Sequence, residues 1–243
     1  MTKKIDFNES EYIYLADTPS DLEKLLKKGE FAVPVLASAK ELRSFPHTDY
    51  VITEASLNDP DTLDTDYLYR IYRRLAGKPW EILRTKRTII REMTVEDVDA
   101  FYEIYSMPGI TDYMDPLFEN PEDEREYTRN YIKNIYGFYG YGLWTVLDKN
   151  TGCVIGRAGV SNIEGCDYPD LGFVIRQEYQ NKGYAFEVCS AIISLCQNEL
   201  KFDKIEARVR PSNEASIRLL SKLGFTISHT PHQGYLEALR TLS

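Results

Sequence analysis

Residues 170–185 read DLGFVIRQEYQNKGYA, which predicts an apolar strand, a short polar loop with one glycine, and the beginning of a helix. Val174 and Ile175 are β-branched residues typical of strands, and beyond Ala185 apolar residues recur at helical spacing. A loop that opens a helix directs backbone N–H groups and the positive end of the helix dipole into one small space, which suits a phosphate or pyrophosphate. An ordinary turn, in which Gly183 only relieves backbone strain, would leave the same pattern.

A second patterned region follows about thirty residues later. Residues 204–210 alternate between charged and apolar side chains, as expected for a strand with one buried face. The sequence Pro211-Ser212-Asn213 then predicts the start of a helix that ends at Gly224, with Asn213 as its N-cap.

These two regions resemble the GNAT superfamily of acetyl-CoA-dependent N-acetyltransferases. Residues 180–185, QNKGYA, resemble the family signature Q/R-x-x-G-x-G/A, and residues 209–225, VRPSNEASIRLLSKLGF, resemble the N-x-x-S helix that ends in K-L-G-F. The resemblance covers residues 86–243 and is of the RimJ/RimL type, which acetylates protein amino termini and other amines. The predicted order of elements over these residues is similar to the whole GNAT fold: strand, two helices, three strands, helix, strand, helix, two strands. The expected fold class is α/β (α+β), with a mixed central sheet flanked by helices.

The composition is typical of a soluble globular protein: 243 residues, 43% hydrophobic and 28% charged. No apolar run reaches the roughly 18 residues that a membrane span needs, and the amino terminus lacks the apolar core of a signal peptide, so we expect a cytoplasmic protein without a membrane partner. The formal charge of −9 argues against a nucleic-acid partner. Four scattered cysteines predict free thiols, two of them buried on a helix, and no metal site is expected.

The first third of the chain predicts a separate small domain. Strands are expected at 11–16, 31–36 and 50–53, and a helix with Thr18 as N-cap and Pro19 in its first turn lies between the first two. This order predicts a small parallel sheet of the βαβ type. A further helix is expected to open at Asp59-Pro60, and a boundary within 77–86 divides the chain into domains 1–85 and 86–243.

Residues 10–55 also resemble the C-terminal part of a haloacid-dehalogenase-like phosphatase. In that family, an Asp-x-x-x-Asp pair after a strand helps to hold magnesium, and Asp17 and Asp21 stand at this spacing. The nucleophilic Asp-x-Asp motif of the family has no counterpart upstream. Asp21 is also explained as a carboxylate that favours the start of a helix.

The GNAT resemblance implies where acetyl-CoA, the expected co-substrate, would bind. Main-chain groups of the strand would pair with the pantetheine arm, with the N–H of Val174 polarising the thioester carbonyl. Backbone N–H groups of the loop would hold the pyrophosphate, Asn213 would reach the pantetheine, and Ser216 would reach the sulfur. The full set implied for the donor is Phe173, Val174, Ile175, Gln180, Asn181, Lys182, Gly183, Tyr184, Ala185, Asn213 and Ser216.

Acetyl transfer to an amine also needs a proton acceptor and a proton donor. Asp170 and Glu164 are the candidate bases, and each could equally be a surface carboxylate. Many relatives carry a tyrosine four residues after the Ser216 position as the acid; this chain has Leu220, which leaves Ser216 or a water molecule.

Two further pairs of residues complete the expectations. Asp112 and Tyr113 lie where relatives bind the acceptor, whereas His229 and His232 are expected to face solvent. The resemblance therefore implies an N-acetyltransferase, monomeric or homodimeric, that acts on a small-molecule amine or a peptide amino terminus. The alternatives are a non-catalytic acetyl-CoA-binding module with an interaction-type N-terminal domain, and a magnesium phosphatase.

Overall fold

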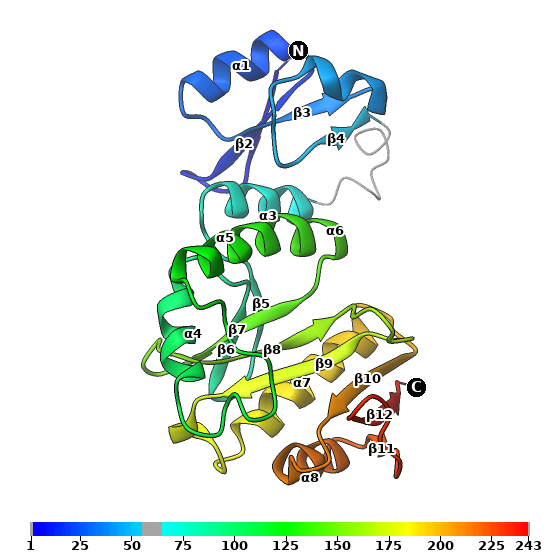
Figure 1. Cartoon of the computed structure of the whole chain (residues 1–243). Helices are drawn as coiled ribbons and strands as arrows, with labels where there is room; N and C mark the ends of the chain where they lie inside the picture. The colour runs from blue at the N-terminus through cyan, green and yellow to red at the C-terminus, as the bar shows by residue number, and fades with distance from the viewer. Residues whose placement is uncertain (1, 55–64, 243) are drawn as a thin grey trace. The chain divides into compact units, whose positions relative to one another are not determined.

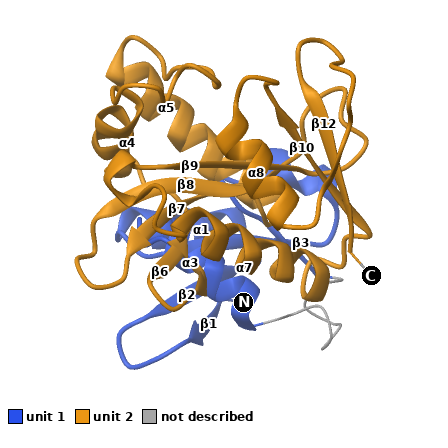
Figure 2. Cartoon of the chain, turned by 90° about the horizontal axis from the view of Figure 1, so that it is seen from below, with its two compact units in different colours: residues 1–80 blue, residues 81–243 orange. Residues whose placement is uncertain are grey.

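The computed structural model describes residues 2–54 and 65–242, and the chain forms two compact units. Figure 2 colours them separately: residues 1–80 and residues 81–243. The junction lies five residues before the predicted boundary of 85/86. The reason is a strand that the sequence analysis left in the linker, β5 (Glu81–Arg84), which pairs with β6 (Thr88–Arg91) of the second unit.

The first unit is built on a four-stranded sheet in the order β1-β2-β3-β4. As predicted, β2, β3 and β4 are parallel; β1 was not predicted and is antiparallel to β2. Buried residues of α3, such as Leu68 and Ile71, pack against β2 and β3. The predicted helix with Leu68 and Ile71 on its buried face is α3, and its predicted start at Asp59 lies outside the described residues. The elements are β1 (Lys3–Asp6), β2 (Tyr12–Ala16), α1 (Pro19–Lys27), β3 (Ala32–Leu36), a 3-10 helix (Ala39–Ser44), β4 (Ile52–Thr53) and α3 (Thr65–Leu75).

The start of α1 has the predicted cap, and this accounts for Asp21, one carboxylate of the acidic pair of the phosphatase resemblance. The hydroxyl of Thr18 accepts from the N–H of Asp21 at 3.2 Å, and the carboxylate of Asp21 lies 3.7 Å from Lys24. Across residues 2–54 and 65–242, no group of three or more His, Cys, Asp or Glu side chains could hold a metal ion. The haloacid-dehalogenase resemblance therefore finds no support in this unit.

The second unit contains an eight-stranded mixed sheet in the order β11-β12-β10-β9-β8-β7-β6-β5 (Figure 1). Neighbouring strands are antiparallel except β9 and β10, which are parallel and in register at Asp170 and Glu206. The predicted order of elements from residue 86 onward is confirmed. The strands after β6 are β7 (Leu143–Asp148), β8 (Val154–Ser161), β9 (Asp170–Ile175), β10 (Lys204–Val209), β11 (Thr226–Ile227) and β12 (Leu236–Thr241).

Helices cover both faces of this sheet: α4 and α5 lie on one face and α7 on the other (Figure 2). Asn120 caps α5 as predicted, and Cys189 and Cys196 lie buried as free thiols on α7. Among the described helices, none combines the length and apolar character needed to cross a membrane. The helical elements are α4 (Asp97–Tyr105), α5 (Pro121–Tyr131), a π-helix (Ile132–Tyr136), α6 (Gly137–Tyr139), a 3-10 helix (Gln177–Tyr179), α7 (Tyr184–Asn198) and α8 (Glu214–Lys222).

Candidate active site

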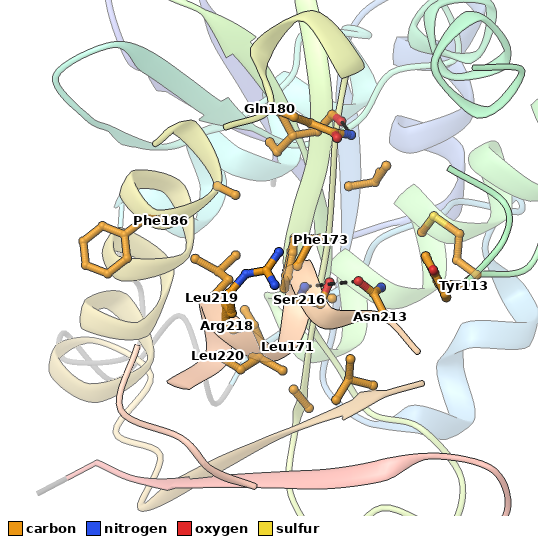
Figure 3. Close-up of a pocket in the computed structure, with 18 of the residues that line it drawn as sticks. Tyr113, Leu171, Phe173, Gln180, Phe186, Asn213, Ser216, Arg218, Leu219 and Leu220 are labelled. Atoms are coloured by element: carbon orange, nitrogen blue, oxygen red, sulfur yellow. Dashed lines mark hydrogen bonds between the residues drawn. The ribbon is translucent and has the colours of Figure 1, made fainter. Parts of the chain in front are cut away.

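A cavity of about 860 Å³ lies where β9 and β10 meet, and its volume is within the range of small-molecule sites (Figure 3). At the start of β9, the N–H of Glu206 donates to the carbonyl of Pro169 at 3.0 Å. Beyond Asp170 the described strands have no further register pair, so the following residues of β9 present an open edge. The walls come from β9, the loop that opens α7, the end of β10, α8 and the loop after α4.

The ladder between β8 and β9 decides which backbone groups reach this open edge. The N–H of Arg176 donates to the carbonyl of Ile155 at 2.7 Å, and the register places Val174 opposite Arg157. Because hydrogen-bonded pairs alternate in an antiparallel ladder, the N–H of Val174 points toward β8. The groups that point toward β10 are the N–H of Phe173 and the N–H of Ile175. The structure therefore corrects the choice of the Val174 N–H, although its side chain lines the cavity.

The loop that opens α7 has the conformation expected of an anion-binding turn. Gly183 has a φ of +81°, in the left-handed region that favours glycine, and precedes the first residue of α7. Asn181 also has a positive φ, of 57°. The side chain of Gln180 donates to the carbonyl of Ile175 at 2.8 Å and closes the turn between strand and loop. Unpaired N–H groups at the start of α7 therefore face the cavity.

The sequence analysis missed a residue that holds this loop from behind. Arg87 donates to the carbonyl of Lys182 at 2.9 Å and pairs with Glu187, on the first turn of α7, at 2.7 Å. Its guanidinium lies 4.0 Å from the ring centroid of Tyr184. Glu187 also accepts from the hydroxyl of Thr85 and from the N–H of Arg87. Arg87 lies about a hundred positions from the loop, so no local motif could identify it.

The start of α8 supplies the other predicted donor residues. The Oδ1 of Asn213 accepts from the N–H of Ser216 at 3.1 Å, as the dashed line in Figure 3 shows, so Asn213 is an N-cap. Its Nδ2 donors have no hydrogen bond within the described chain. Ser216 lines the cavity, and one turn later Leu220 presents an apolar wall where many relatives carry a tyrosine.

Of the two candidate bases, only Asp170 lies in the cavity. It is 8% exposed, and burial raises the pKa of its carboxyl to about 6, while Arg208 opposes the rise. Its Oδ1 is buried without a hydrogen-bond partner among the described residues, and the nearest cation, Nε of Arg208, lies 3.8 Å away. Glu164 is exposed and outside the cavity lining.

The remaining predicted residues divide between the cavity and the surface. Tyr113 lines the cavity, and its hydroxyl donates to the carbonyl of Ser212 at 3.3 Å. Four predicted residues are exposed and lie outside the cavity lining: Asp112, Lys182, His229 and His232. The carbonyl of Lys182 accepts the hydrogen bond from Arg87. The solvent exposure predicted for the two histidines is confirmed.

Comparisons with known proteins agree with this geometry. A sequence model described as "Acetyltransferase (GNAT) domain" matches residues 87–226. The chain is 30% identical over 149 residues to the uncharacterized N-acetyltransferase p20 of Bacillus licheniformis, covering 60% of this chain and 82% of p20. It is 36% identical over 90 residues to the [ribosomal protein uS5]-alanine N-acetyltransferase of Escherichia coli, covering 36% and 44%. A crystal structure of a GNAT-family acetyltransferase from Bacillus anthracis is similar, with a TM-score of 0.53 and 25% identity, covering 65% and 95%.

Proposed function

The chain belongs to the GNAT acetyltransferase family and is an N-acetyltransferase, and we propose that it transfers the acetyl group of acetyl-CoA to a primary amine by direct attack. The observation that carries the proposal is that three features suited to acetyl transfer lie in the same cavity. The open edge of β9, the anion-binding loop before α7 and the buried carboxylate of Asp170 all line one cavity. We further propose that residues 81–243 form the catalytic domain and that residues 1–80 form a separate small domain.

The residues present fit acetyl-CoA, which would supply the acetyl group and a thiolate leaving group. The N–H groups of Phe173 and Ile175 are placed to pair with an amide-containing arm, as another strand would. The loop around Gly183 offers N–H groups and a helix dipole to a pyrophosphate. The free Nδ2 donors of Asn213 lie at the same cavity.

The chemistry assigns a task to each remaining group. The N–H of Phe173 polarises the thioester carbonyl, and the amine nitrogen forms the new N–C bond as the C–S bond breaks. Asp170 takes the proton that the amine loses, directly or through water, because its pKa of about 6 leaves it ionised near neutral pH. Leu220 has no proton to give, so the departing thiolate takes one from Ser216 or from water.

For the acceptor, we propose the specificity of the RimJ/RimL type. One relative is a ribosomal-protein alanine N-acetyltransferase, which supports a peptide amino terminus as the acceptor; a small-molecule amine is the alternative. Tyr113, on the loop after α4, lines the cavity from this side.

The test measures release of free CoA from acetyl-CoA with a panel of amines and peptides, together with calorimetric binding of acetyl-CoA. Gly183→Glu should weaken that binding by at least about 100-fold, because it strains a left-handed position and places a negative charge at the anion site. The matched control is Gly152→Glu, which also has a positive φ, +72°, but lies in the exposed β7–β8 turn. Equal binding by both variants, or no CoA release with any acceptor, would refute the proposal.

A further inference from the structure

Two arginines and a tyrosine form a cluster in the cavity wall that the proposed chemistry does not use. Arg208, on β10, and Arg210, just after it, both line the cavity. Their guanidinium carbons lie 5.7 and 4.5 Å from the ring centroid of Tyr235, which precedes β12. Each guanidinium is therefore within the range of a cation–π contact with the same ring. We call these three residues the arginine cluster.

Among the described residues, the guanidinium donors of this cluster lack close anionic partners. Arg208 has its nearest carboxylate oxygen on Asp170 at 3.8 Å, and the guanidinium groups of both arginines have no hydrogen bond within residues 2–54 and 65–242. Two other arginines of this unit have close carboxylate partners: Arg91 pairs with Asp97 at 2.7 Å and Arg125 with Asp99 at 2.6 Å. A planar guanidinium presents a fork of donors that matches a carboxylate or phosphate. The arginine cluster therefore has hydrogen-bond donors available for a carboxylate or phosphate of a ligand.

The arginine cluster lies on the face of the sheet away from the anion-binding loop. Val174 packs against Ile104 of α4, so alternate residues of β9, including Asp170, face α4. Arg208 lies beside Asp170. Arg210 follows Arg208 by two positions along the line of β10, so its side chain is expected on the same face of the sheet. The loop of Gly183 instead opens α7, which covers the opposite face. The position of the cluster therefore favours the acceptor over the phosphates of the donor.

We propose that the acceptor amine carries a carboxylate close to its nitrogen and that Arg208 and Arg210 bind this carboxylate. The proposal rests on the proposed function, because Asp170 is the group that receives the proton of the amine. Since Arg208 lies 3.8 Å from Asp170, amine and carboxylate must be separated by only a few bonds. The charged residues of the cavity lining are one carboxylate and four cations: Asp170, Arg208, Arg210, Arg218 and Lys222. This cationic lining contrasts with the net charge of −9 for the whole chain.

Two sources share this chemistry, and matched acceptors distinguish them. One pair is phenylalanine and phenylalanine amide, which differ in the α-carboxylate of a free amino acid. The other is a pair of C-terminally amidated tetrapeptides that begin Ser-Glu or Ser-Gln, which differ in an acidic side chain near the peptide amino terminus. In at least one pair the carboxylate should raise kcat/KM by about tenfold or more, as expected for one charge-assisted hydrogen bond.

Arg210→Gln should remove this preference, mainly through KM of the acceptor, and leave the calorimetric affinity for acetyl-CoA within about twofold. Arg208→Gln should do the same and should also shift the pH profile of the rate, since it changes the surroundings of Asp170. Arg129→Gln is the matched control, because Arg129 is half-exposed on α5 and outside the cavity. Equal use of the charged and neutral members of both pairs would overturn the proposal. So would a loss of acetyl-CoA affinity in Arg210→Gln without any change in acceptor preference.

Failure of the proposed function would look different. It would appear as no CoA release with any acceptor, while calorimetric binding of the two tetrapeptides still reports on the arginine cluster. Tighter binding of the Ser-Glu peptide than of the Ser-Gln peptide, lost in Arg210→Gln, would then support the anion site without turnover. Equal binding of the two peptides would refute it for the peptide source.

Discussion

The two sides of the cavity are built differently. On the donor side, the loop before α7 is held by hydrogen bonds within the protein: Gln180 to Ile175, and Arg87 to Lys182. On the acceptor side, the buried Oδ1 of Asp170 has no hydrogen-bond partner among the described residues, and Arg208 approaches it only to 3.8 Å.

This difference indicates how each side recognises its substrate. A satisfied network holds the donor loop in one conformation, so the N–H groups at the start of α7 are ordered in advance. A buried carboxylate oxygen without a hydrogen-bond partner is costly, and the cost falls when an amine or water donates to it. The donor side is therefore pre-organised, whereas the acceptor side is completed by the acceptor. Substitutions on the two sides should differ in kind, and the following predictions test that.

The largest effect is expected from Asp170→Asn. The amide cannot accept the proton of the amine, so kcat/KM should fall by about 10²- to 10⁴-fold while acetyl-CoA affinity changes little. The pH dependence gives a second readout. Because burial raises the pKa of Asp170 to about 6, and the active form is ionised, wild-type activity should rise with pH through about 6 and then level off. That rise should be missing from the residual activity of the variant.

Glu164→Gln is the control for this prediction. Glu164 was the other candidate base, but it is exposed and lies outside the cavity, so the substitution should leave the rate and its pH profile unchanged. A large loss of rate in Glu164→Gln with little loss in Asp170→Asn would reverse the assignment of the base.

A smaller effect, on binding alone, is expected from Arg87→Ala on the donor side. The substitution removes the hydrogen bond to Lys182 and leaves Glu187 without its cation, so the loop should lose its fixed conformation. Affinity for acetyl-CoA should fall by about tenfold, the equivalent of about 1.4 kcal/mol, with little change in the kcat measured at saturation.

Calorimetry with acetyl-CoA measures this effect, and Arg84→Ala serves as the comparison. Arg84 lies three positions away and pairs with the exposed Glu81, outside the cavity. Unchanged affinity in Arg87→Ala would show that the loop holds its conformation without this network, which would contradict the proposed pre-organisation.

Local patterns in the sequence predicted the parts of the fold and site that depend on neighbouring residues. Gly183 stands where the backbone needs a left-handed conformation, and Asn120 caps its helix, because a turn or a cap is decided within a few positions. The order of elements in the second unit follows from the same local signals, and the resemblance of that order and of the two motifs implied the GNAT fold from residue 86 onward.

What the sequence could not supply depends on pairing between distant segments. The direction of the Val174 N–H follows from the register of β8 with β9, and periodicity does not specify which pairs are hydrogen-bonded. Arg87 acts on a loop about a hundred positions away. β5 is only four residues long, and it is a strand because it pairs with β6. Its own residues gave no strand signal, so the segment was predicted to be a linker. Asp170 and Glu164 both remained candidate bases, because burial, which separates them, is a property of the folded chain.

The smallest expected effect compares two asparagines with the same structural task. Asn120 caps α5 by accepting from the N–H of Glu122 at 3.2 Å, and Asn213 caps α8 by accepting from the N–H of Ser216 at 3.1 Å. Replacement of either by Ala should lower the free energy of unfolding by about 1 kcal/mol, measured by urea denaturation. Only Asn213 also presents free Nδ2 donors to the cavity.

Asn213→Ala should therefore raise KM for acetyl-CoA by a few-fold, about the value of one neutral hydrogen bond, whereas Asn120→Ala should leave KM unchanged. Both variants lose an N-cap of the same kind, so they should lose similar stability. A difference in KM for acetyl-CoA between them then reports the contact of Asn213 with acetyl-CoA. Equal KM values in the two variants would mean that Asn213 only caps α8. The donor would then be held by the loop of Gly183 and the edge of β9 without help from this asparagine.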